Sequence, residues 1–186
     1  LDIKGERGFR GRGVSYCATC DADLFAELDI MVVGNGDAAI EEAIYLTKFA
    51  NTVTIVVIHD EGVLDCNKAS AEKAFQNGKI KWIWNSVLVE IKGEGIVQGV
   101  VIKNLKTGEL SEQPTSGVFF FVGTVPKTDF LKGRVDLDKQ GYIVADEAME
   151  TSVPGVFAAG DARQKYLRQV VTAASDGAIA AFSTEK

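Results

Sequence analysis

The chain has 186 residues, of which 46% are hydrophobic, and a formal net charge of −6 at pH 7. This length and apolar content suffice for one ordinary domain or two small ones, and an acidic chain without a basic patch is not expected to bind nucleic acid. No apolar run approaches the ~20 residues that cross a bilayer, so we expect a cytoplasmic protein with neither a membrane span nor a signal peptide.

The amino-terminal stretch leads into a pair of cysteines. Residues 1–14 are rich in glycine and charge, which is typical of a connector or hinge. Cys17-Ala18-Thr19-Cys20-Asp21 follows, and in a Cys-x-x-Cys segment one thiolate attacks a substrate disulfide while the other resolves the mixed disulfide. A helix that starts here would let the sulfurs meet and would favour the thiolate. Asp21 is a candidate proton shuttle for the exchange.

Two other interpretations of the cysteine pair remain open. A zinc site needs further ligands, and Cys66 with the lone His59 makes a poor second pair, so we expect no metal. A permanent structural disulfide is also possible, although so short a loop removes little chain entropy. The motif and its surroundings favour redox use.

A strand–helix–strand unit is predicted next. The apolar run 29–33 and the β-branched run 53–58 have the character of buried parallel strands, with a helix up to residue 50 between them. The turn Gly34-Asn35-Gly36-Asp37-Ala38-Ala39 has the form G-x-G-x-x-A, with Asp37 expected as the helix N-cap. Its glycines would let backbone approach a pyrophosphate, although a tight turn in any α/β domain can have this form.

The end of the second strand bears on which cofactor can bind. His59-Asp60-Glu61 stands about where a ribose-binding carboxylate is expected, roughly 20 residues beyond the glycine turn. These acids would repel a 2′-phosphate, so NADPH is disfavoured, whereas NADH or an empty, vestigial site is compatible with Asp60. Solvated loop residues are an equally simple interpretation of both acids.

The middle of the chain predicts a helix and a meander. Residues 68–77 are expected to form a short helix, and Cys66 before it is expected to be a partly buried thiol. The runs 80–84, 87–91 and 96–102 have the pattern of consecutive antiparallel strands, continued after Gly108.

The last third predicts a change of domain. Residues 117–123 have the character of a buried strand, and residues 141–144 and 156–161 those of two further strands, the last with Gly160 and Asp161 at its carboxyl end, where ligands bind in open α/β sheets. From Gln169 a helix of small residues is expected to run to the end.

Three segments together resemble the low-molecular-weight thioredoxin reductases. They are the redox segment Gly11–Asp21, the helix motif Glu41-Glu42-Ala43 after the glycine turn, and residues 151–161 with Arg168-Gln169-Val170. The resemblance implies a redox disulfide between Cys17 and Cys20, with Cys20 facing a flavin. It also implies that Asp21 is the acid/base.

The resemblance further implies FAD bound by Gly160, Asp161, Arg168, Gln169 and Val170, and a homodimer when the protein is intact. Residues 1–9 would be a hinge, 10–118 the nucleotide-binding and redox domain, and 119–186 the carboxyl-terminal part of a split FAD-binding domain.

Two departures from the family pattern have consequences. Val57, Ile58 and His59 stand where the family carries a His-Arg-Arg group, which resembles the branch that takes electrons from ferredoxin, with NADH as the second choice. The amino-terminal half of the FAD domain is missing, and the chain starts at Leu1 rather than methionine. We therefore expect a fragment or processed chain that binds FAD poorly by itself.

The predicted fold class is α/β: a three-layer, Rossmann-like dinucleotide-binding domain with a parallel sheet and an antiparallel meander, plus part of an FAD domain. The predicted function is transfer of electrons through FAD to the cysteine pair and on to a thioredoxin-like protein. The alternatives are an NADH-dependent peroxiredoxin reductase and a catalytically incomplete split subunit.

Overall fold

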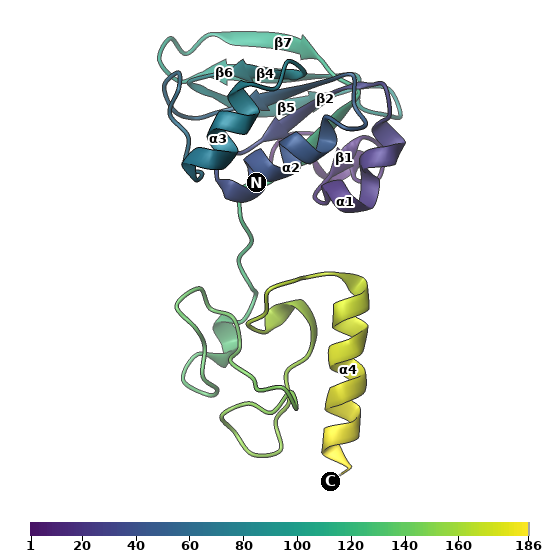
Figure 1. Ribbon diagram of the computed structural model, residues 1–186, viewed down its shortest axis with the longest axis vertical. Coiled ribbons are helices and arrows are strands. Elements are labelled where there is room, and N and C mark those ends of the chain that lie inside the picture. Colours follow the sequence, from purple (N-terminus) through teal and green to yellow (C-terminus); the bar gives the residue numbers. More distant parts are fainter. Residues whose placement is uncertain (186) are drawn as a thin grey trace. The chain divides into compact units, whose positions relative to one another are not determined.

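The chain folds into two compact units. The computed structural model describes residues 1–185, and the units divide between Val122 and Gly123 (Figure 1). The sequence placed the boundary after residue 118, which falls inside strand β8 (Gly117–Phe120). Phe119 and Phe120 are buried in the first unit, so their burial keeps the whole strand in that unit.

A parallel sheet of five strands forms the middle of the first unit. Its order is β1-β8-β2-β3-β4, with the bounds Val14–Ser15 for β1, Asp29–Val33 for β2, Thr52–Val56 for β3 and Ile80–Ile83 for β4. The register aligns Ile30 of β2 with Val53 of β3 on one side and with Gly117 of β8 on the other. Both strands that the apolar runs predicted are therefore present and lie at the centre of the sheet.

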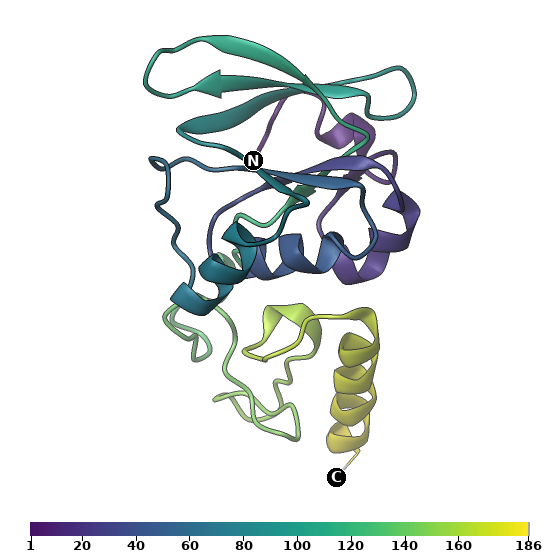
Figure 2. The ribbon, with the colours of Figure 1, turned by 45° about the horizontal axis from the view of Figure 1, so that its top comes forward.

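Helices cover one face of this sheet. They are α1 (Ala18–Asp21), the 3-10 turn Ala22–Phe25, α2 (Asp37–Leu46) and α3 (Lys68–Phe75), and α2 and α3 lie side by side under the sheet (Figure 2). Side chains alternate along β2, so Ile30 and Val32 pack toward the helices while Met31 and Val33 pack toward the opposite face. Burial of both faces explains why the strand is a continuous apolar run.

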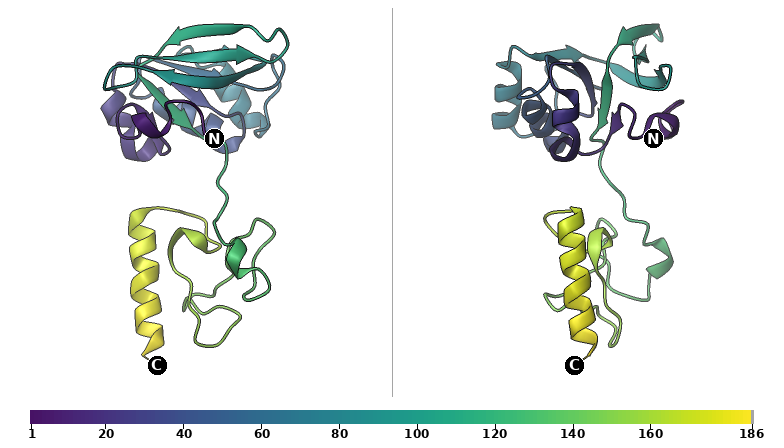
Figure 3. Two further views of the ribbon diagram at one scale, coloured as in Figure 1. Left: turned by 180° about the vertical axis from the view of Figure 1, so that it is seen from behind. Right: turned by 90° about the vertical axis from the view of Figure 1, so that its right-hand side faces the viewer.

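An antiparallel sheet of three strands covers the other face. Its strands are β5 (Ser86–Lys92), β6 (Gly99–Asn104) and β7 (Leu110–Pro114), and the edge-on view of Figure 3 shows the resulting three layers. Leu88, Ile91 and Val100 from this sheet pack against Met31 and Val118 of the parallel sheet. The amino-terminal stretch, which includes the 3-10 turn Arg7–Phe9, reaches β5 through a bridge between Lys4 and Glu90. The predicted α/β fold with a parallel sheet and a meander is confirmed.

One strand assignment was wrong. Residues 80–84 were expected to begin the antiparallel meander, but β4 pairs in parallel with β3 at the edge of the main sheet. The chain reverses only at Asn85, whose φ is 51°, and then enters β5. Trp82 and Trp84 stack on each other with ring centroids 4.9 Å apart, and Phe75 of α3 packs against Trp82.

The second unit contains little regular structure beyond one long helix. Its elements are the 3-10 turns Asp129–Leu131 and Gly160–Ala162 and helix α4 (Val170–Thr184), which confirms the expected terminal helix. The strands predicted at 141–144 and 156–161 are not formed; Ile143 and Phe157 make only isolated bridges. A strand needs neighbours to complete its ladder, and the described part of this unit offers single bridges instead. Large apolar side chains such as Val125, Phe130 and Val170 are consequently exposed.

Candidate functional site

Cys17 and Cys20 are joined by a disulfide at the start of α1. Cys17 is the N-cap, with extended backbone, and Cys20 lies in the single helical turn that follows. The sulfurs are bonded at 2.04 Å and the Cα atoms are 5.3 Å apart. Cys20 is exposed and Cys17 half-buried, so the bond is open to attack from solvent at the Cys20 side.

Parallel strands and helix packing hold this segment in place. Val14 and Ser15 pair with Val118 and Phe119 of β8, directly before the cysteines. Ala18, only 1% exposed, packs into the core between the sheet and the helices. The redox segment is therefore attached to the sheet on both sides of Cys17.

A hydrogen-bond cluster lies beside the cysteine pair. Buried Glu6 accepts a hydrogen bond of 2.5 Å from the Tyr16 hydroxyl, and Arg10 donates to that hydroxyl at 3.2 Å. Burial favours the protonated acid, but the bonds from Tyr16 and from the Ile3 amide outweigh it and lower the pKa of Glu6 to about 2. Arg12 donates to the Gly8 carbonyl oxygen. Both arginines are thus engaged within the connector.

Asp21 is half-buried at the end of α1. Its Oδ2 accepts a hydrogen bond of 2.6 Å from the hydroxyl of Ser15, which also accepts a bond from the Cys17 amide at 3.2 Å. Sequence reasoning missed Ser15, because a serine in a short strand carries no pattern of its own. The available signal was the spacing of six residues between Ser15 and Asp21. That spacing brings the two side chains together only when α1 folds back on β1.

The glycine turn joins β2 to α2. Gly34 has φ 136°, and a Cβ there would overlap the carbonyl oxygen of Phe121, so the position requires glycine. Among the described residues, no heavy atom beyond the chain neighbours lies within 4 Å of a Cβ built on Gly36. Ala39 is fully buried beneath the turn, whereas Ala38 is exposed. The turn is thus open at Gly36, where a pyrophosphate would approach, and closely packed at Gly34 and Ala39, as a dinucleotide-binding turn requires.

Asp37 does not cap the helix, contrary to the prediction. Gly36 is the N-cap and Asp37 is the first helical residue; its Oδ1 accepts bonds from the backbone and side-chain nitrogens of Asn67 at 2.7 and 2.9 Å. These two bonds lower the pKa of Asp37. The missing Cβ lets Gly36 take the extended N-cap conformation, and Asp37 instead fastens the turn to the loop that follows β3.

The loop after β3 carries the predicted ribose-binding acid. Exposed Asp60 forms an ion pair with Lys106, and that hydrogen bond lowers the pKa of Asp60. His59 lies 2.9 Å from Asp65, and Asp65 also accepts a bond of 3.0 Å from Asn35 in the glycine turn. Asp60 and Asp65 therefore make the loop beside the glycine turn acidic. The nearby lysine, Lys106, is already paired with Asp60.

The five predicted flavin-binding residues come together at the start of α4. Gln169 is the N-cap and Val170 the first residue of the helix. The guanidinium of Arg168 lies 3.9 Å from the Tyr142 ring centroid, and its Nε donates to the Asp161 carbonyl oxygen at 3.4 Å. Gly160 precedes Asp161 with φ 80°.

Asp176 was missed by the sequence reading. It is buried, and its Oδ2 accepts bonds from the Gly160 amide at 3.0 Å, from Arg163 at 3.0 Å and from Lys165 at 2.6 Å. Burial disfavours its charge, but the bonds from Lys165 and Arg163 outweigh this and lower the pKa of Asp176. Asp176 thereby fixes the turn that presents Asp161.

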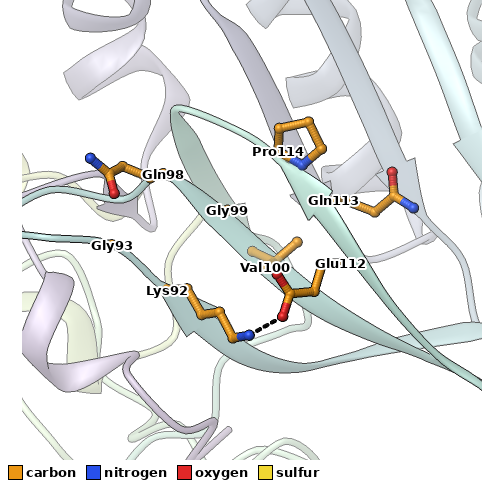
Figure 4. Close-up of a pocket in the computed structure, with 8 residues that line it drawn as sticks. All are labelled: Lys92, Gly93, Gln98, Gly99, Val100, Glu112, Gln113 and Pro114. Carbon is orange, nitrogen blue, oxygen red and sulfur yellow. Dashed lines mark hydrogen bonds and ion pairs between the residues drawn. The ribbon is translucent and has the colours of Figure 1, made fainter.

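A further pocket lies outside these segments. A pocket of about 330 Å³ lies at one end of the antiparallel sheet, where Lys92 and Glu112 form an ion pair across it (Figure 4). Within residues 1–185, no cluster of histidine, cysteine and acidic side chains could hold a metal ion. Over the same residues no helix has the length and apolar character to span a membrane.

Comparisons with known proteins single out one family. Residues 1–177 match the family described as pyridine nucleotide-disulphide oxidoreductase. Thioredoxin reductase of Peptoclostridium acidaminophilum is 55% identical over 98% of this chain and 59% of its own length. The crystal structure of thioredoxin reductase from Streptococcus pyogenes is 47% identical with a TM-score of 0.92, covering 100% of this chain and 60% of that one.

A second solved structure is a more distant match. It is the ferredoxin-flavin thioredoxin reductase from Clostridium acetobutylicum, 31% identical with a TM-score of 0.55, which covers 100% of this chain and 58% of that one. The chain thus spans about 59% of the length of the curated relatives it matches. The resemblance seen in the sequence motifs is confirmed.

Proposed function

This chain belongs to the pyridine nucleotide-disulphide oxidoreductase family, and we propose that it is the redox-disulfide part of an enzyme of the thioredoxin reductase type. The observation that carries the proposal is the Cys17–Cys20 disulfide, which stands at a helix start on a parallel sheet with Cys20 exposed. The complete protein would pass two electrons to this pair and from it to the disulfide of a thioredoxin-like acceptor.

The exchange between the cysteine pair and the acceptor disulfide has two steps. In the reduced pair, one thiolate attacks the acceptor disulfide; the acceptor S–S bond breaks, a mixed disulfide forms and an acceptor thiolate leaves. The second cysteine then attacks the mixed disulfide, which closes Cys17–Cys20 and releases the second acceptor thiolate. Two electrons and two protons move from the pair to the acceptor, and Asp21 is the proposed carrier of those protons.

The residues at the start of α4 fit the flavin that the family implies. The first turn of this 15-residue helix contains no acidic residue, and Gly160 leaves its turn uncrowded. Asp161 is exposed, so its carboxylate can accept a hydrogen bond from a ribityl hydroxyl. Val170, which is 87% exposed, offers an apolar contact. FAD, when bound, supplies the two-electron chemistry that reduces the cysteine pair.

The acidic side chains around the glycine turn favour a donor without a 2′-phosphate. Asp37 lies in the first turn of α2, Asp65 bonds to Asn35, and the Lys106 charge is balanced by Asp60. We therefore infer that NADPH is a poor ligand, and that the electrons come from ferredoxin or from NADH. The likeness to a ferredoxin-flavin thioredoxin reductase supports the first of these donors.

We further infer a cytoplasmic location, because a dithiol relay needs a compartment that keeps thiols reduced. The named relatives give no support to the peroxiredoxin reductase alternative, and no described contact favours it.

The cysteine roles are tested with the polypeptide as it stands. The chain is reduced, freed of reductant and mixed with thioredoxin in its disulfide form, and the thioredoxin thiols are trapped by alkylation and counted by mass spectrometry. The wild type is expected to release thioredoxin dithiol, whereas Cys20→Ser is expected to lower this release at least about 100-fold, because no resolving thiol remains. Cys66→Ser, the matched control, removes the remaining cysteine and should behave as wild type. Full release by Cys20→Ser, or a wild-type pair that reductants leave closed, would refute the proposal.

A further inference from the structure

The hydroxyl of Ser15 is placed between two parts of the redox segment. Ser15 is only 3% exposed, and its register opposite Phe119 fixes it in β1. Its Oγ lies 2.6 Å from Asp21 Oδ2, 3.2 Å from the Cys17 amide nitrogen and 3.3 Å from the Cys17 carbonyl oxygen. One buried oxygen thus contacts both the start and the end of α1.

The direction of these hydrogen bonds follows from the single proton of a hydroxyl. The carboxylate of Asp21 can only accept, and it is much nearer than the Cys17 carbonyl oxygen. Ser15 therefore donates to Asp21 and accepts from the Cys17 amide. A bond from a hydroxyl to a carboxylate is among the stronger and shorter kinds.

The other hydroxyls of the segment are engaged elsewhere. Thr19 donates to the sulfur of Cys17 at 3.4 Å, because a disulfide sulfur has no proton to give, and Tyr16 donates to Glu6. Ser15 bonds to Oδ2 of Asp21, and the carboxylate has a second oxygen, Oδ1, for proton exchange. Ser15 thus sets which oxygen of Asp21 is held.

We propose that Ser15 is a positioning residue for Asp21: its hydroxyl holds one carboxylate oxygen and the Cys17 amide together, so that the other oxygen faces the protons of thiol–disulfide exchange. The assignment rests on the proposed relay through Cys17 and Cys20.

Several other ionisable groups surround this segment. Glu6 and Arg10 of the connector bond to each other and to Tyr16. Helix α2, which packs against α1, carries Glu41 and Glu42, and burial followed by the charge of Glu41 raises the pKa of Glu42. A test must therefore separate Asp21 from these neighbours.

The test measures the rate of exchange between the reduced chain and oxidised thioredoxin at pH 7 in a double-mutant cycle. Ser15→Ala is expected to slow exchange about tenfold in the wild-type background, the scale of one lost hydrogen bond to a charged group. The same substitution should have no effect in an Asp21→Asn background, because the acid that Ser15 positions is then absent. It should keep its full effect in a Glu42→Gln background.

Two controls address structural damage. Ser15→Thr keeps the hydroxyl and should keep the wild-type rate. Ser86→Ala removes a hydroxyl that is equally buried and donates to the Trp84 carbonyl oxygen, away from the site, and should leave the rate unchanged. If Ser15→Ala slowed exchange by the same factor in the wild-type and Asp21→Asn backgrounds, the role of Ser15 would be structural and the proposal overturned.

A second variant covers the case in which Ser15→Ala does not fold. The Cys17 amide bonds to the Ser15 oxygen, so its NMR shift in the reduced chain should change when Asp21→Asn removes the carboxylate to which the Ser15 hydroxyl donates. A Cys17 amide with the same shift in wild type and in Asp21→Asn would overturn the proposal. Exchange by the wild type with no effect of Ser15 refutes only the positioning role, whereas a wild type that never reduces thioredoxin refutes the relay itself.

Discussion

Replacement of Glu6 by glutamine tests the reasoning about the buried acid beside the cysteine pair. The Glu6 carboxylate is almost fully buried, and it accepts hydrogen bonds from the Tyr16 hydroxyl and the Ile3 amide. Glutamine has nearly the same shape but carries no charge. The substitution therefore removes the interactions that depend on ionisation while it keeps the packing.

The size of the effect follows from the pKa. The pKa of Glu6 falls from 4.5 to about 2 on folding, and about 2.5 units at ~1.4 kcal/mol each give roughly 3 kcal/mol. A carboxyl group whose pKa is lowered by folding stabilises the protein above its unfolded pKa, and that stability is lost as the pH falls from about 5 toward 2. Glu6→Gln should therefore be up to about 3 kcal/mol less stable than wild type at pH 7, and this difference should shrink toward zero near pH 2.

Urea unfolding monitored by tryptophan fluorescence measures this difference. Both tryptophans, Trp82 and Trp84, lie in the first unit with Glu6, so their signal reports on that unit. The control is Glu112→Gln, which breaks an exposed ion pair with Lys92 and should change stability by less than about 1 kcal/mol. A Glu6→Gln difference that stays the same from pH 7 to pH 3 would refute the argument that ionisation of Glu6 stabilises the fold.

Two further predictions concern the glycine turn and its neighbours. Gly34→Ala should destabilise the first unit by about 2–4 kcal/mol in the same urea assay, because its methyl group would overlap the Phe121 carbonyl oxygen, whereas Gly36→Ala, at φ −84° and in open space, should cost less than about 1 kcal/mol; equal losses would contradict the packing. Replacing Asp60 and Glu61 together with arginine should raise the affinity for NADPH, but not for NADH, by about tenfold in a fluorescence titration, since a 2′-phosphate would gain cationic partners. An unchanged NADPH affinity would show that charge is not what disfavours this ligand.

The strand–helix–strand unit was predictable because its signals are local. The runs 29–33 and 53–58 are mostly apolar along their length, which is typical of strands in a sheet buried on both faces, and the glycines between them favour a turn. The cysteine pair was also a local signal, since the spacing of Cys17 and Cys20 favours a redox disulfide over the two alternatives.

Features that depend on distant partners were not predictable. β4 has the same apolar pattern whether it pairs in parallel with β3 or in antiparallel with β5, so the sequence alone did not decide its sheet. Residues 156–161 have the composition of a strand, but composition does not supply the neighbours that a strand requires. Ser15 bonds to Asp21, 6 positions away, and Asp176 bonds to Gly160, 16 positions away. No periodic pattern in the sequence predicts such contacts.

The antiparallel sheet supports two segments that carry predicted site residues. The turn before β6 contacts the redox segment, since the Val97 amide donates to the Arg12 carbonyl oxygen, and the turn after β6 contacts the loop that follows β3 through Lys106 and Asp60. A substitution at either end of β6 can therefore disturb one of these segments without itself touching a substrate.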